Sequence, residues 1–139
     1  MPPLIRWYLK AALLYLVAAL LMGTVIAGQS LLGIPGYARL LSPVYLHLFI
    51  VGWVTQLIFG VALWMFPKQS VEQPRGNESV AWLIFILLNT GLLLRAVAEP
   101  MVSINPAAFW AYLLALSAVL QAAAGISFAY QAWQRVKVR

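Results

Sequence analysis

Four long stretches without any charged residue account for most of this sequence of 139 residues. They cover residues 11–38, 40–67, 79–94 and 100–134. A helix needs about 20 mainly apolar residues to cross the roughly 30 Å hydrocarbon core of a bilayer. Because lipid offers no partner for backbone polar groups, such stretches fold as helices. The sequence therefore predicts an all-α fold, a four-transmembrane-helix bundle that forms a single membrane domain.

The composition fits a surface that faces lipid rather than water. Hydrophobic residues make up 64% of the chain and charged residues only 9%, whereas soluble domains have about a quarter of their residues charged. The net charge of +6 comes from basic residues at the ends of the apolar stretches, without the patch expected for binding nucleic acid. The absence of cysteine excludes disulfides, iron–sulfur clusters, thiolate metal sites and covalently attached haem.

Helix-breaking residues give the expected bounds of the four helices. We predict helices over residues 4–27, 43–66, 79–99 and 106–133. The second begins at Ser42 and Pro43, a cap residue followed by proline at the first helical position. The third is expected to end at Pro100.

The basic residues predict the orientation of the chain in the membrane. Seven of them lie on the side that holds both termini: Arg6, Lys10, Lys68, Arg75, Arg135, Lys137 and Arg139. Only Arg39 and Arg95 lie on the opposite, outer side. Because Lys and Arg accumulate on the cytoplasmic side, we expect a multi-pass protein of the cell inner (plasma) membrane with both termini cytoplasmic.

The only histidine of the chain is His47, about four residues inside the second helix and thus roughly 6 Å below its outer end. Ionisable side chains at such depth are rare and are functional candidates. A neutral imidazole is a common ligand of metal ions and of haem iron. The alternative is a structural histidine that hydrogen-bonds to a neighbouring helix.

Arg95 is expected at a similar depth on the third helix, which runs in the opposite direction. Arginine in lipid needs an anion or access to water, and the two propionates of haem are anions that arginine binds with two hydrogen bonds. The alternative pairs Arg95 with Glu99 one turn later, although this order of charges is the weaker one on a helix.

Small and amide residues repeat every four positions on two helices. They are Gly52, Gln56 and Gly60 on the second helix, and Ser117, Gln121 and Gly125 on the fourth. Such spacing lets helices pack closely within one chain or between copies, with hydrogen bonds from the amides. Alternatively, Gly52 makes room for a flat macrocycle beside His47.

Residues 41–67, LSPVYLHLFIVGWVTQLIFGVALWMFP, resemble a helix of the haem–copper oxidase subunit I superfamily. The likeness is greatest to small relatives of the nitric oxide reductase large subunit and of the high-affinity oxidase catalytic subunit. It lies in His47, the pair at 52–53, Gly60 and the closing Phe-Pro at 66–67. Residues 92–100, LLLRAVAEP, resemble the same relatives less specifically.

The resemblance implies that His47 binds a low-spin b-type haem and is its metal ligand. Further cofactor contacts are then expected from Arg95 at a propionate, and from Gly52 and Thr55 along the haem face. Many relatives have a second histidine at the position of Tyr45. The full oxidases have many more helices and metal-ligating histidines, so we expect no oxygen or nitric oxide reduction by this chain alone.

The sequence leaves open which group is the sixth ligand of such a haem iron. A second His47 from a symmetric homo-oligomer is one source, and methionine or water is another. Met22 and Met101 are the methionines of the outer half, where packing is the more common role of such residues. A five-coordinate iron is the remaining alternative.

The sequence thus gives three functional hypotheses. The first is a membrane b-type haem protein for electron transfer or diatomic gas sensing. The second is a haem-free accessory or assembly subunit of a respiratory membrane complex, with a respiratory-chain partner. The third is a carrier of a small uncharged solute or of copper. The chain has no aspartate, and its lack of paired carboxylates disfavours ion-driven transport and hydrolysis.

Overall fold

The computed structural model describes residues 1–31, 33, 36–71 and 76–136, with the backbone alone at 37–39. The helices are α1 (Pro3–Gly28), α2 (Tyr37–His47), the π-helical η1 (Leu48–Thr55), α3 (Gln56–Met65), α4 (Glu78–Ile104) and α5 (Ala108–Trp133). Because α2, η1 and α3 follow one another without a break, they form one rod. Among the described residues, four helices, with this rod counted as one, are long and apolar enough to cross a membrane. This confirms the predicted all-α fold with four spans.

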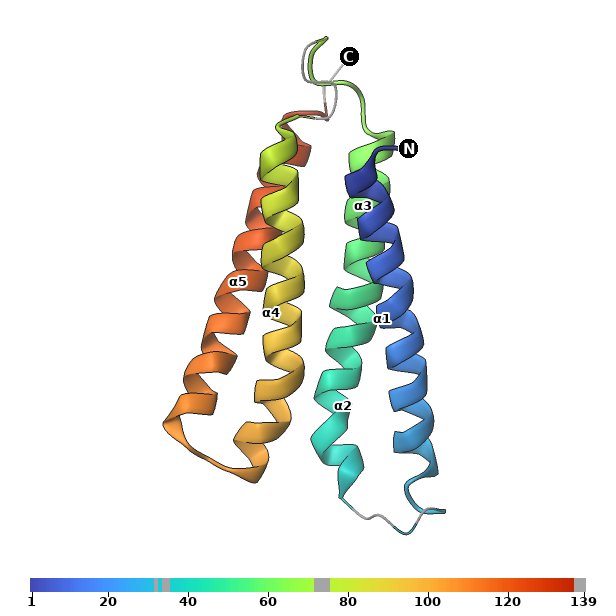
Figure 1. Ribbon diagram of the computed structural model, residues 1–139, viewed down its shortest axis with the longest axis vertical. Coiled ribbons are helices and arrows are strands. Elements are labelled where there is room, and N and C mark those ends of the chain that lie inside the picture. Colours follow the sequence, from blue (N-terminus) through green and yellow to red (C-terminus); the bar gives the residue numbers. More distant parts are fainter. Residues whose placement is uncertain (32, 34–35, 72–75, 137–139) are drawn as a thin grey trace.

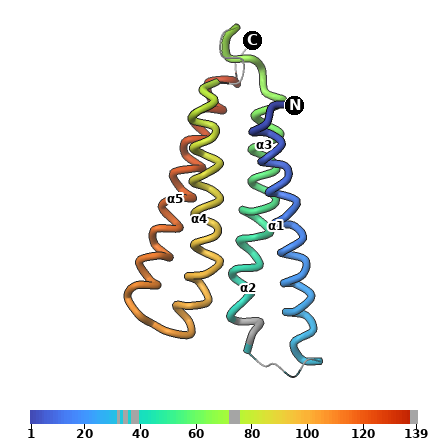
Figure 2. Tube along the Cα trace, viewed as in Figure 1, coloured from blue at the N-terminus to red at the C-terminus, as the bar shows by residue number. Residues whose placement is uncertain are grey.

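The four spans are arranged as two hairpins. One hairpin pairs α1 with the α2–η1–α3 rod, and the other pairs α4 with α5 (Figures 1 and 2). The start of α1 and the end of α5 lie at one end of the bundle, which we call the terminal end (Figure 1). The opposite end, where α1 meets α2 and α4 meets α5, is called the far end.

Aromatic and polar contacts join the two hairpins. The Tyr8 ring of α1 packs edge-on against Phe85 of α4, with 5.0 Å between centroids, and its hydroxyl donates to the Ala81 carbonyl at 3.2 Å. Phe59 of α3 stacks on Phe128 of α5 with 3.7 Å between centroids. These contacts lie in the half of the bundle nearer the terminal end.

The core is narrow and divided into two clusters. The first contains Leu4, Tyr8, Phe59, Leu63, Ala81, Ile84, Leu88 and Ala124. The second, nearer the far end, contains Ala19, Val44, Leu48 and Leu92. Large apolar side chains also cover the outside, with Leu14 on α1 70% exposed and Ile126 on α5 71% exposed. An apolar exterior over every span is the arrangement expected of helices in lipid.

The π-helical segment keeps one face of the rod directed inward. Val44, Leu48, Gly52, Gln56 and Gly60 are all buried and follow one another every four residues. Around an α-helix of 3.6 residues per turn, each such step overshoots a full turn by about 40°. A π-helix, with its i to i+5 hydrogen bonds, takes more residues per turn. The segment η1 therefore reduces the drift and lets the four-residue repeat stay buried.

Two predicted helix ends were wrong. The second span begins at Tyr37, after Gly36 with its positive φ of 99°, so Pro43 lies inside α2 rather than at its start. The third span continues through Pro100 to Ile104. Proline fixes a helical φ and removes one donor, and membrane helices tolerate this because neighbouring groups replace the lost bond. The predicted ends of the first and fourth spans agree with α1 and α5 within two residues.

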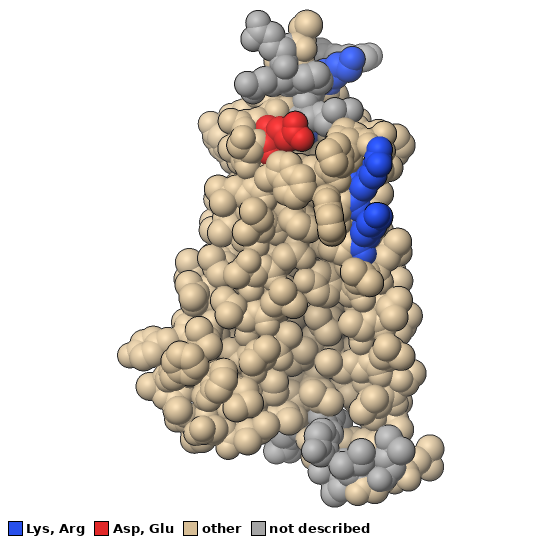
Figure 3. Space-filling model, viewed as in Figure 1, with Lys and Arg blue, Asp and Glu red and all other residues tan. Residues whose placement is uncertain are grey.

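Charged side chains are concentrated near the terminal end on the face shown in Figure 3. Arg135, just beyond α5, is a buried charged residue, with only 2% of its surface accessible. Its guanidinium donates to the carbonyls of Leu63 at 3.1 Å, Phe66 at 2.6 Å and Pro67 at 3.1 Å. These carbonyls lie at the C-terminal end of α3, where helical partners run out. Arg135 therefore ties the end of α5 to the end of α3.

Candidate functional site at the far end

Three ionisable side chains meet between α2 and α4 toward the far end. His47 Nδ1 lies 3.3 Å from Glu99 Oε2, and Arg95 Nε lies 3.5 Å from Glu99 Oε1. The antiparallel course of the second and third spans predicted similar depths for His47 and Arg95, and both indeed reach the same carboxylate. The Arg95–Glu99 pair, which the sequence left as one of two alternatives, is present. We call these three residues the far-end cluster.

The backbone of α2 also holds the imidazole. His47 Nδ1 lies 2.8 Å from the carbonyl oxygen of Pro43, one turn earlier on the same helix. His47 is the last residue of α2, immediately before η1. The ring is therefore held from two sides, by its own helix and by α4.

The far-end cluster is partly open on the side of the bundle. The side chains of His47 and Arg95 are 27% and 22% exposed, and that of Glu99 is 14% exposed. No described residue hydrogen-bonds to His47 Nε2. The imidazole thus keeps one nitrogen available to a group that approaches from outside the four spans.

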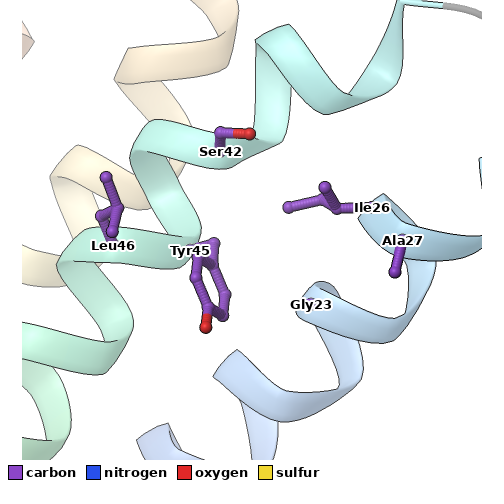
Figure 4. A pocket seen from close by; sticks show the side chains of 6 residues that line it. All are labelled: Gly23, Ile26, Ala27, Ser42, Tyr45 and Leu46. Atoms are coloured by element: carbon purple, nitrogen blue, oxygen red, sulfur yellow. The ribbon is translucent and has the colours of Figure 1, made fainter.

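Tyr45 does not join this cluster, because it points from the rod toward α1. Its ring enters a cavity of about 380 Å³ between the two helices, lined by Gly23, Ile26, Ala27, Ser42, Tyr45 and Leu46 (Figure 4). A Cβ built on Gly23 would lie 3.1 Å from Tyr45 Cε2, so this glycine makes room for the ring. The cavity does not border His47.

The other residues expected along a haem face are placed elsewhere. A Cβ on Gly52 would lie 2.8 Å from Tyr15 Cβ and 2.9 Å from Leu92 Cδ2, so side chains of α1 and α4 fill the space beside it. Met22 packs against the second core cluster. Thr55 is half-buried at the end of η1, eight residues after His47. Close helix packing accounts for Gly52 without a cofactor.

Glu99 is a functional candidate that the sequence did not predict as a partner of His47. The sequence predicted it only as a possible partner of Arg95. Counting along antiparallel helices places it at the level of His47, and this signal was available. The contact itself depends on which faces of α2 and α4 meet, which the sequence alone does not fix.

The side chains of the far-end cluster suit a cofactor that itself supplies most of the ligands of its metal ion. Among the described residues, no group of three or more His, Cys, Asp or Glu side chains could hold a metal ion. A bare zinc ion takes three or four protein ligands, whereas haem iron takes one or two axial ligands. One imidazole with a free nitrogen, beside an arginine, is compatible with haem at the open side of the far-end cluster.

Comparisons with known proteins give no relative for this chain. No protein-family model, no curated protein and no solved structure matches it.

Proposed function

We propose that this chain is a membrane haem protein of the b type, with His47 as an axial ligand, that serves electron transfer or diatomic gas sensing. The observation that carries the proposal is the placement of the imidazole. It lies within a membrane span, with Nδ1 engaged at 2.8 Å by the Pro43 carbonyl and Nε2 without a partner among the described residues. The resemblance of residues 41–67 to a haem-carrying helix gives independent support.

The haem lies against the open edge of α2 and α4 rather than between α1 and the rod. Tyr15 fills the space between α1 and the rod at the level of Gly52. Arg95 uses Nε toward Glu99, and its terminal nitrogens make no hydrogen bond with a described residue. They are free to bind a propionate in the bidentate manner of arginine.

A second copy of the chain covers the outward face of the haem. Closed twofold symmetry is the usual form of self-association, and it would bring a second His47 to the opposite side of the iron. A haem held by two such histidines would supply one-electron chemistry, whereas a haem held by one His47 alone would keep a site for a diatomic ligand. The protein holds it by His47, anchors it by Arg95 and keeps water from it with the apolar side chains of the spans.

The location follows from the distribution of positive charge. The excess of Lys and Arg at the terminal end supports cytoplasmic termini in the cell inner membrane. The far-end cluster then lies in the outer leaflet. A redox partner of the respiratory chain at the outer surface would exchange electrons with a haem at that depth.

The test is the visible spectrum of the protein purified from haem-replete cells, recorded oxidised and reduced. We expect a Soret band in the wild type and its loss in His47→Ala. Growth and purification of the His47→Gly variant with imidazole should restore the band, since the added ring replaces the missing ligand. Colourless wild-type protein with native helix content would contradict the proposal.

A second candidate function has one observation in its favour. The cavity between α1 and the rod does not border His47, and apolar side chains cover the outside of α1 and α5. A haem-free accessory or assembly subunit of a respiratory complex would use such surfaces for helix contacts. Colourless protein that copurifies with respiratory subunits would favour this second function.

A further inference from the structure

We infer that Glu99 is the positioning residue for His47. Its carboxylate and the Pro43 carbonyl hold the imidazole as the Nδ1–H tautomer, which leaves the lone pair on Nε2. The inference rests on the proposed function where it concerns iron. The tautomer itself is a property of the chain without any cofactor.

The geometry at Nδ1 decides the tautomer. Two oxygen atoms face this nitrogen, the Pro43 carbonyl at 2.8 Å and Glu99 Oε2 at 3.3 Å. A carbonyl and an ionised carboxylate can only accept hydrogen bonds, and in a neutral imidazole one nitrogen donates and the other accepts. If Nδ1 carried the lone pair, it would face two acceptors without a hydrogen. The proton therefore belongs on Nδ1, and Nε2 is the atom free to bind a metal.

The surroundings of Glu99 fit this role. Its side chain is 14% exposed, and Oε2 has no hydrogen-bond partner that satisfies strict geometry. His47 Nδ1 lies 3.3 Å from this oxygen. Arg95 lies 3.5 Å from the other oxygen and balances the negative charge, which a membrane interior would otherwise penalise. The carboxylate therefore lies between the Arg95 guanidinium and the His47 ring.

The charge of Glu99 has a consequence for the metal. Metal-ligating histidines usually donate their second ring N–H to a carboxylate or a backbone carbonyl, which orients the ring and raises the basicity of the ligand. His47 has one acceptor of each kind. A more basic ligand favours ferric over ferrous iron, so the negative charge of Glu99 should lower the reduction potential of the bound haem.

The experiment uses the fact that the chain has one histidine. Labelling with ¹⁵N-histidine gives nitrogen NMR signals from His47 alone, in the protein before haem is added. We expect a protonated Nδ1 and an unprotonated Nε2. Glu99→Gln should remove the negative charge beside Nδ1 and move the Nδ1 proton signal upfield, and it should shift the haem reduction potential to more positive values. Glu99→Asp, which keeps the charge, should restore part of both effects.

Glu78→Gln is the matched control. It makes the same change on the same helix, in the first turn of α4 at the terminal end, far from His47. It should leave the NMR signals and the potential at their wild-type values. Circular dichroism checks that each variant is folded.

Three outcomes decide the matter. An Nε2–H tautomer in the wild type would overturn the inference. So would a folded Glu99→Gln protein whose proton signal and potential equal those of Glu78→Gln. The wild-type protein could instead be colourless and contain an Nδ1–H ring whose proton signal shifts in Glu99→Gln. That result would overturn the proposed function but support Glu99 as the positioning residue of His47.

Discussion

Two glycines of the rod set how closely α1 approaches it. A Cβ on Gly52 would lie 2.8 Å from Tyr15 Cβ, and a Cβ on Gly60 would lie 2.8 Å from Tyr8 Cβ. Both distances are shorter than real Cβ atoms show, so each glycine is required by a tyrosine of α1. Tyr15 and Tyr8 in turn bind α4, through Asn89 Oδ1 at 3.0 Å and the Ala81 carbonyl at 3.2 Å.

Gly52→Ala should therefore destabilise the bundle. The added methyl meets side-chain atoms close to the backbone of α1, and overpacking of this kind costs about 1–3 kcal/mol. The free energy of unfolding in mixed detergent measures the effect. Gly125→Ala on α5 is the control, because a Cβ there has no atom within 4 Å. Equal stability of the two variants would show that α1 and the rod are less closely packed than described.

The sequence predicted the residues of the far-end cluster better than their arrangement. His47 and Arg95 stood out because ionisable side chains are costly in lipid. Gly52 had two interpretations, close helix packing and room for a macrocycle. A four-residue repeat of small residues indicates close approach by another group but does not identify that group. The identity of the approaching group, Tyr15, follows from the rotation of α1, and no local pattern encodes it.

At the scale of the helices, the terminal end depends on an arginine that belongs to no helix. Arg135 closes α3 by three hydrogen bonds to its last carbonyls, and its guanidinium lies 5.9 Å from the centre of the Phe66 ring. The sequence predicted a basic tail at this position but only as a mark of orientation. The structure also differs from the prediction at Pro43 and Pro100, which lie inside α2 and α4 although each proline alone predicted a helix end.

Arg135→Gln should loosen the joint between α3 and α5. A hydrogen bond to a charged group contributes about 1.5–3 kcal/mol, and glutamine cannot reach three carbonyls at once. We expect a loss of unfolding free energy of at least that size, together with faster hydrogen exchange at the end of α5. Arg6→Gln is the control, since Arg6 is exposed and its side chain donates to the nearby Met1 carbonyl. A loss of similar size in both variants would contradict a special role for Arg135.

At the scale of the whole molecule, the chain is two hairpins joined along a narrow core. Length and hydropathy suffice to predict the four spans, because the thickness of the bilayer fixes the length of a crossing helix. The π-helical segment was not predicted, since it depends on keeping residues from Val44 to Gly60 against two neighbouring helices. The open side of the far-end cluster likewise appears only when both hairpins are in place.

The central claim is that the nitrogen left free on His47 binds iron. Because this is the only histidine, pulsed EPR of the ferric protein labelled with ¹⁵N-histidine tests it directly. We predict a ¹⁵N hyperfine coupling of the strength expected for an imidazole bound to the haem iron. A ferric haem spectrum without that coupling would contradict the claim, because the iron would then be held by another group.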